Sequence, residues 1–149
     1  MYPNELLKLL EPEDPSALVE ALDRLQAGFT VDQDTRRGGY LRQADAVAAY
    51  GAFYGLRTAT KVAHIVRELG LTPEHVVDVA GGTLGAALGV AAAAPGLRRV
   101  TGLDRANPAL RFGAETLARY RPKLEINTRR WELLRDQTVP PGDLIVLAN

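Results

Sequence analysis

Residues 76–85 read Val76-Val77-Asp78-Val79-Ala80-Gly81-Gly82-Thr83-Leu84-Gly85. A short apolar run ends in glycines, and an alanine-rich segment follows over residues 85–94. This order predicts a strand, a tight glycine turn and a helix. Glycine lets a ligand approach the backbone, and the first turn of a helix offers free N–H groups to an anion. The stretch therefore indicates either a ligand-binding turn or a tight strand-to-helix connection without a ligand.

A second acidic residue, Asp104, follows 26 residues after Asp78. Residues 99–103 are expected to form another strand, which ends in Asp104. In a nucleotide-binding βαβ unit, an acid at this place accepts hydrogen bonds from ribose hydroxyls. The alternative role is the N-cap of the next helix, but Asn107 already stands where we expect that cap. The two signals together favour a nucleoside-containing cofactor at the carboxyl ends of the first two strands.

The chain after residue 70 alternates between strands and helices. A helix is expected over residues 107–120, a third strand over 124–127, a turn at 140–142 and a fourth strand over 143–148. Strands separated by helices predict an α/β fold, with parallel pairing, right-handed crossovers and helices on both faces of the sheet.

Residues 1–70 are expected to form a separate helical region, with the α/β domain over residues 71–149. Leucines mark a short helix at 6–10, and Asp14-Pro15-Ser16 is a typical helix start. A polar loop is expected at 30–39. Apolar spacing then predicts one long helix or two over residues 44–69, with a possible break at Gly55.

The composition excludes several functional classes. No cysteine means no disulfide scaffold, no thiolate metal site and no cysteine nucleophile, and two histidines argue against a histidine-rich metal centre. No membrane span or signal peptide is recognisable, so a cytoplasmic protein without membrane contact is expected. The 18 basic and 18 acidic residues balance, yet ten basic residues face only four acids between Leu97 and Arg135. This stretch indicates either an RNA-facing edge or a solvated helix face.

The glycine spacing does not fit the dinucleotide pattern G-x-G-x-x-G, and an acid inside the first strand is also foreign to it. Residues Asp78 to Thr83 instead resemble the first motif of class I S-adenosylmethionine-dependent methyltransferases, in its D-x-A-G-G-T variant. Residues 100–104 resemble the second motif, and residues 143–149 resemble the fourth strand of that family. The resemblance implies a partial Rossmann-like sheet of strand order 3-2-1-4 and S-adenosyl-L-methionine as the cofactor.

The resemblance also implies roles for individual residues. The alanine and the two glycines of the turn would face the methionine part, Asp104 would hold the ribose, and residues near Asn127 and Thr128 would lie by the adenine. No catalytic residue and no metal ligand is assigned. The cofactor-binding residues expected from the resemblance are Asp78, Ala80, Gly81, Gly82, Gly85, Asp104, Asn127 and Asn149.

Leu84 departs from the methyltransferase motif, because it stands where the last glycine is usual, and Gly85 comes one residue late. We expect a leucine there to add bulk where the backbone approaches the ligand. The turn would then either shift so that Gly85 takes the place of the motif's last glycine, or bind the cofactor weakly.

The helical segment before the first motif is similar to the lead-in of the mitochondrial-type small ribosomal subunit methyltransferase-like family, which has bacterial members. The similarity covers residues 42–149 and rests on the stretch 46–57, although Leu56 replaces a usual proline. It implies a methyltransferase acting on ribosomal RNA or another small-subunit component. The alternative is a non-catalytic ribosome-assembly or RNA-associated module that keeps the fold, and a nicotinamide-dependent oxidoreductase ranks third.

Class I methyltransferase sheets have seven strands, whereas this sequence supplies four. The fourth strand would be an exposed apolar edge, which invites pairing with another chain. We therefore expect a fragment, a truncated gene product or half of an intertwined oligomer, with self-association through that strand.

Overall fold

A computed structural model describes residues 8–10, 14–30, 44–136 and 138–148. Most of the expected first helix, the polar loop at 31–39 and Asn149 lie outside these residues. The helical elements are α2 (Pro15–Thr30), α4 (Ala44–Tyr50), the π-helical turn η2 (Gly51–Gly55), α5 (Leu56–Glu68), α6 (Gly85–Ala93) and α7 (Asn107–Tyr120). The strands are β1 (His75–Val79), β2 (Arg99–Asp104), β3 (Glu125–Arg130) and β4 (Leu144–Val146).

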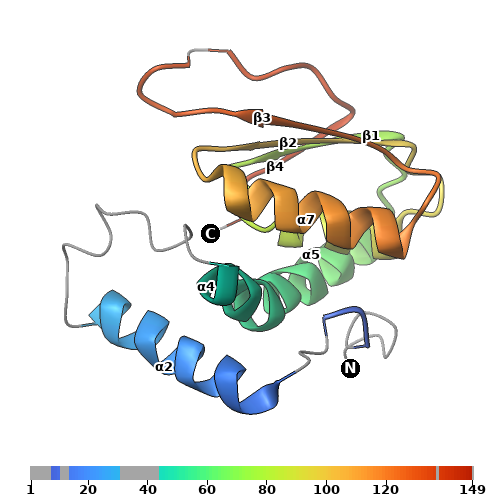
Figure 1. Cartoon of the computed structure of the whole chain (residues 1–149). Helices are drawn as coiled ribbons and strands as arrows, with labels where there is room; N and C mark the ends of the chain where they lie inside the picture. Colours follow the sequence, from blue (N-terminus) through green and yellow to red (C-terminus); the bar gives the residue numbers. More distant parts are fainter. Residues whose placement is uncertain (1–7, 11–13, 31–43, 137, 149) are drawn as a thin grey trace.

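The four strands form one parallel sheet in the order β3-β2-β1-β4 (Figure 1). This confirms the expected α/β fold and strand order. In the register, Asp78 of β1 lies beside Gly102 of β2 and Val146 of β4. The carboxyl ends of β1, β2 and β3 therefore meet at one edge, and the turns that follow β1 and β2 emerge there together.

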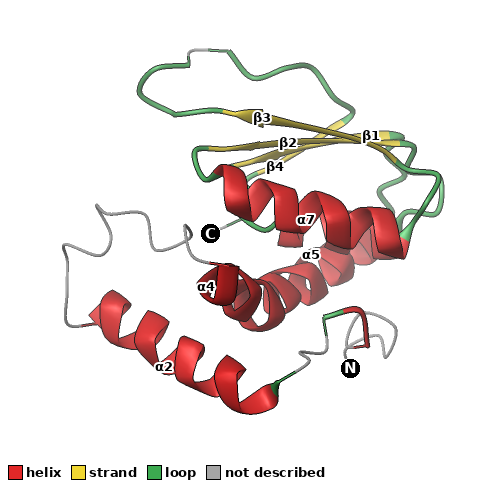
Figure 2. Ribbon diagram, viewed as in Figure 1, coloured by secondary structure: helices red, strands yellow, loops and turns green. Residues whose placement is uncertain are grey.

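The helices cover one face of the sheet, whereas helices on both faces were expected (Figure 2). Alternate strand residues point to opposite faces. Val76 and Val100 join the main apolar cluster with α5, α6 and α7, while Val77 and Leu103 pack with Trp131 on the other face. None of the described residues between β3 and β4 is helical. The second face is therefore crossed by a loop in place of a helix.

The segment expected as one or two helices over 44–69 is continuous, and a π-helical turn at Gly51–Gly55 stands where the break was expected. The backbone of η2 and α5 lies directly against the backbone of α6. A Cβ atom at Gly85 would lie 2.6 Å from the carbonyl oxygen of Gly55, and one at Gly89 would lie 2.4 Å from that of Ala59. Glycines at these two α6 positions therefore let η2 and α5, together called the lead-in helix (residues 51–68), lie directly against the start of α6.

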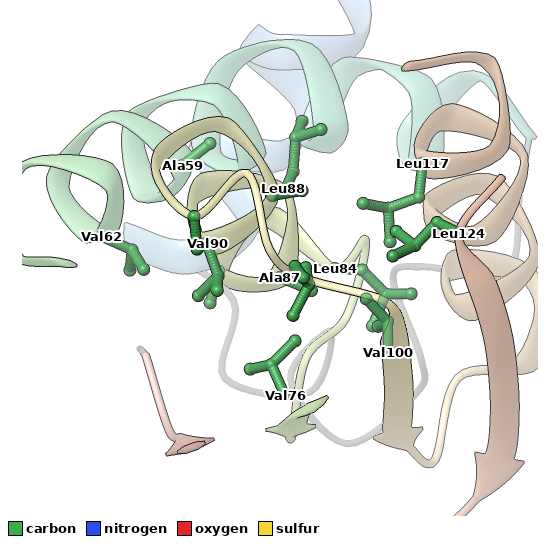
Figure 3. Packing of buried hydrophobic residues seen from close by; sticks show 14 of the residues in the cluster. Ala59, Val62, Val76, Leu84, Ala87, Leu88, Val90, Val100, Leu117 and Leu124 are labelled. Carbon is green, nitrogen blue, oxygen red and sulfur yellow. The ribbon is translucent and has the colours of Figure 1, made fainter. Parts of the chain in front are cut away.

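The main core lies between this helical layer and the sheet, and Figure 3 shows how its side chains meet. Leu84, Val76 and Val100 are fully buried at its centre. Burying a side chain of this size stabilises the fold by about 1.5–3 kcal/mol. The core therefore fixes the start of α6 against β1 and β2.

Local signals set several helix ends. Asp14 caps α2, because its Oδ1 accepts the N–H groups of Ser16 and Ala17. The expected N-cap at Asn107 is wrong: α7 begins at Asn107, and Ala106 is its N-cap residue. Among the described residues, no helix is long and apolar enough to cross a membrane.

Candidate functional site

The turn after β1 has an unusual backbone. Ala80, Gly82 and Leu84 all adopt left-handed conformations, with φ of 54°, 51° and 56°. For residues with a Cβ atom, this region costs about 1–2 kcal/mol. Such strain persists only where the surrounding structure imposes it, and it clusters at ligand-binding sites. The turn is therefore held in shape by its surroundings.

Gly81 closes the turn over the carboxyl group of Asp78. A Cβ atom at Gly81 would lie 2.8 Å from Cγ of Asp78 and 2.9 Å from its Oδ1. No larger residue fits without displacing that carboxyl group. Glycine at this position thus lets the backbone lie directly on an acidic side chain.

Asp78 is buried, with 1% of its surface exposed. Its Oδ2 accepts the N–H of Ala87 at 2.9 Å, while its Oδ1 has no hydrogen-bond partner. Burial raises the pKa of Asp78 to about 7; the Ala87 hydrogen bond opposes this rise and the charge of Asp104 adds to it. A buried acceptor without a donor is costly. A ligand that donates a proton or carries a positive charge would relieve that cost.

Asp104 connects the two turns at this edge of the sheet. Its Oδ2 accepts the N–H of Gly82 at 2.9 Å, and its Oδ1 accepts the N–H of Ala106 at 2.8 Å. The carboxylate thus supports the start of α7 as well as the glycine turn. Each oxygen keeps a further lone pair, so Asp104 can still accept hydrogen bonds from hydroxyl groups.

A small pocket of about 30 Å³ lies between the lead-in helix and the turn. Tyr50 covers it, since its Cε1 lies 3.8 Å from the ideal Cβ position of Gly82. No motif in the sequence marks Tyr50, Thr58 or Ala148 as pocket residues. The pocket is lined by Tyr50, Gly55, Thr58, Asp78, Ala80, Gly81, Gly82, Thr83, Gly85, Ala86 and Ala148.

Leu84 does not project toward this pocket. Its side chain is fully buried and fills the space left by three glycines, Gly81, Gly102 and Gly113. The expected bulk beside a ligand is therefore directed into the core. Gly85 does line the pocket, at the point where α6 meets the lead-in helix.

Asn127 lies away from the other expected site residues. It pairs with Thr101 inside the sheet, whereas Arg130 is the β3 residue beside Asp104. Its Nδ2 donates to Oε1 of Glu125, and the hydrogen bonds from Arg99 and Asn127 lower the pKa of Glu125. The structure thus brings Asp78, Ala80, Gly81, Gly82 and Gly85 together, with Asp104 adjoining; Asn127 is apart and Asn149 is not described.

One further charged group near the site, Arg57, has another role. Arg57 does not line the pocket; its guanidinium lies 5.4 Å from the ring centroid of Phe53, in a cation–π contact. Within the described ranges, no three His, Cys, Asp or Glu side chains form a group that could hold a metal ion. The chemistry available is thus hydrogen bonding by two carboxylates and the backbone of the turn.

The fold is similar to that of several solved proteins, one of which is described as a methyltransferase. PigF with SAH superposes with a TM-score of 0.59 at 20% identity, covering 89% of this chain and 40% of that one. The mitomycin 7-O-methyltransferase MmcR gives 0.55 at 19% identity over 93% and 46%, and LaPhzM gives 0.54 at 15% over 87% and 41%. This chain therefore spans less than half of each. No family model and no curated protein matches the sequence.

Proposed function

We propose that this chain binds S-adenosyl-L-methionine and forms the cofactor-binding part of a methyltransferase. The observation that carries the proposal is the unpartnered Oδ1 of Asp78, buried beneath the glycine turn in the pocket that Asp104 adjoins. The cofactor's methionine end carries an ammonium group, which is the kind of donor that Oδ1 lacks. The matching fold of PigF, solved with SAH, supports the same choice of ligand.

Different residues of the site would contact different parts of the cofactor. Asp78 and the turn would hold the methionine end, and Asp104 would accept the ribose hydroxyls. The register places Arg130 and Trp131, rather than Asn127, beside Asp104 at the end of β3, where the base would lie. The bound cofactor supplies a methyl group on a sulfonium, and the protein contributes positioning. We assign no catalytic residue.

The pocket must open before the cofactor can enter. Ligand pockets usually enclose about 300–1,000 Å³, whereas this one holds about 30 Å³. Tyr50 lies over Gly82 and belongs to α4, whose continuation η2 is π-helical. A π-helical turn is frequent at functional sites. We infer that α4 moves outward with Tyr50 when the cofactor binds.

Isothermal titration with S-adenosylmethionine and with SAH tests the proposal. Because a cationic ligand favours ionised Asp78, binding near pH 7 should release a proton, and the measured heat should then depend on the ionisation enthalpy of the buffer. The variant Asp78→Asn should bind more weakly and lose this dependence. No heat at millimolar cofactor would overturn the proposal.

For the substrate, we propose ribosomal RNA or another component of the small ribosomal subunit. The support is the excess of arginine between residues 97 and 135. The second candidate is a non-catalytic RNA-associated module that keeps the fold, which the small volume of the closed pocket favours. Transfer of a labelled methyl group to small-subunit RNA distinguishes the two: cofactor binding without transfer indicates the module.

A further inference from the structure

The arginine-rich stretch separates into two groups once its contacts are known. The first group is used within the fold. Arg121 donates to four carbonyl groups around the end of α6, and Arg99 pairs with Glu125. Arg98 and Arg135 also pair with acids, Arg129 donates to a backbone carbonyl, and Arg105 has a partner.

The second group makes no hydrogen bond or ion pair within the described residues. It consists of Arg111 and Arg119 on α7, Lys123 in the following turn and Arg130 at the end of β3. All four side chains are exposed. All four lie on α7, on β3 or in the turn that joins them. A cluster of free cations on neighbouring elements is the usual footprint of a polyanion.

Two of these four cations meet in a hollow between α7 and β3. Its volume is about 300 Å³, and Arg111 and Arg130 line it together with the hydroxyl-bearing Thr128 and the amide-bearing Asn107. Glu115 also lines the hollow, so its net charge is one positive unit. Two guanidinium groups with a hydroxyl and an amide suit the oxygens of a phosphate.

The hollow has a defined relation to the cofactor site and to the remaining cations. Arg130 is the register partner of Asp104, so the hollow opens beside the acid assigned to the ribose. Arg119 lies eight residues after Arg111 on the same helix, about 12 Å along its axis. A nucleic-acid strand carrying several phosphates can reach both Arg111 and Arg119, whereas a single small anion cannot.

We propose that the hollow between α7 and β3 binds a phosphodiester of single-stranded RNA, and that the strand continues along α7 past Arg119. The proposal rests on the proposed function in one respect only, since it names RNA as the substrate class. RNA binding itself requires no cofactor.

Fluorescence anisotropy with a labelled single-stranded RNA, in the absence of cofactor and at several salt concentrations, tests this site. The double variant Arg111→Gln/Arg130→Gln should weaken binding about tenfold. Losing two phosphate contacts should reduce the slope of log affinity against log salt by about 1.4. The matched control Lys61→Gln/Arg98→Gln removes the same charge from exposed positions elsewhere and should change neither value. Circular dichroism checks that all variants fold.

A third variant and a small-anion arm sharpen the result. Glu115→Gln should tighten RNA binding roughly threefold, because it removes the acid from the hollow. Equal losses in both double variants would overturn the site in favour of diffuse attraction. Inorganic phosphate that displaces RNA at equal concentration would also overturn it, in favour of a free-anion site. Titration of the single variant Arg111→Gln with S-adenosylmethionine should match the unmodified chain, because Arg111 has no part in the proposed cofactor site, so failure of cofactor binding would be seen separately.

Discussion

The backbone N–H of Gly82 donates a hydrogen bond of 2.9 Å to Oδ2 of Asp104. One carboxylate thereby ties the turn after β1 to the end of β2, while its other oxygen holds the N–H of Ala106. The shape of the glycine turn and the position of the acid are thus set by the same contact. Changes at Asp104 should therefore affect folding and ligand binding together.

Asp104→Asn tests this coupling. The amide offers one oxygen where two N–H groups need acceptors, so unfolding should become easier by about 1–2 kcal/mol. Cofactor affinity should fall at least tenfold. Denaturant unfolding and calorimetric titration measure the two effects.

Asp143→Asn is the matched control for this variant. Oδ2 of Asp143 accepts the N–H groups of Glu74 and His75 at the opposite edge of the sheet. Because one oxygen of Asp143 accepts both N–H groups, the oxygen of asparagine can keep both hydrogen bonds, so a smaller loss of stability with unchanged cofactor affinity is expected. If both variants lost affinity equally, the link between Gly82 and Asp104 would have no special part in binding.

The stability of the chain should fall as pH rises from 5 to 8. The folded-state pKa of Asp78, about 7, lies above its ordinary value of 3.8. The folded state therefore binds the proton more tightly, and the stability this gives is complete below pH 3.8 and is lost as pH rises toward 7. Relative to Asp78→Asn, the unmodified chain should lose about 2–3 kcal/mol over this range. Parallel pH profiles of the two chains would contradict it.

Leu84→Ala should lower the free energy of unfolding by about 2–4 kcal/mol, because the side chain occupies the space beside three glycines and leaves a cavity when removed. Leu133→Ala removes the same atoms from a side chain that is 77% exposed, and should change stability little. Urea denaturation compares the two. A small effect of Leu84→Ala would show that the leucine does not support the turn from within.

Gly85→Ala should be destabilising by about 1–3 kcal/mol through overpacking. Its Cβ would lie 2.6 Å from the carbonyl oxygen of Gly55, so η2 would have to move away from α6. Gly96→Ala provides the control, since a Cβ there has no neighbour within 4 Å. Thermal unfolding measures both. Equal melting temperatures would indicate that the contact between η2 and α6 is loose.

Self-association through β4 is the remaining expectation. Within the described residues β4 pairs only with β1, and Ile145 and Leu147 are 55% and 72% exposed. An apolar free edge of this kind pairs readily with another chain. Sedimentation should show association that rises with concentration and that Ile145→Lys reduces. A monomer at all concentrations would be inconsistent with it.

Much of the fold could be predicted from the sequence, because apolar runs separated by glycine and proline mark buried strands. β3 was expected to end at Asn127 but continues to Arg130. Thr128, Arg129 and Arg130 are exposed at the edge of the sheet, so no apolar pattern marks them. The missing second helical layer has a similar cause, because the expectation came from the usual α/β arrangement and not from residues 131–143.

The candidate site was predictable only in part. Asp78, the turn and Asp104 are close in space because strand ends meet at one edge, which the order of elements already implies. The direction of the Leu84 side chain depends on its left-handed backbone and on Gly102 and Gly113, which are distant in sequence. The position of Tyr50 over the turn depends on how α4 packs, and single-sequence patterns do not contain that information.

The central position of β1 has a consequence for synthesis of the chain. Val76 pairs with Val100 on one side and with Leu144 on the other. The first partner follows 24 residues later and the second 68 residues later, so the first loop closes at lower entropic cost. On the ribosome, one edge of β1 therefore has no partner until β4 emerges from the exit tunnel. During that interval, the nascent chain exposes this edge of β1 to chaperones and to neighbouring nascent chains, including the carbonyl group of His75 that later accepts the N–H of Asp143.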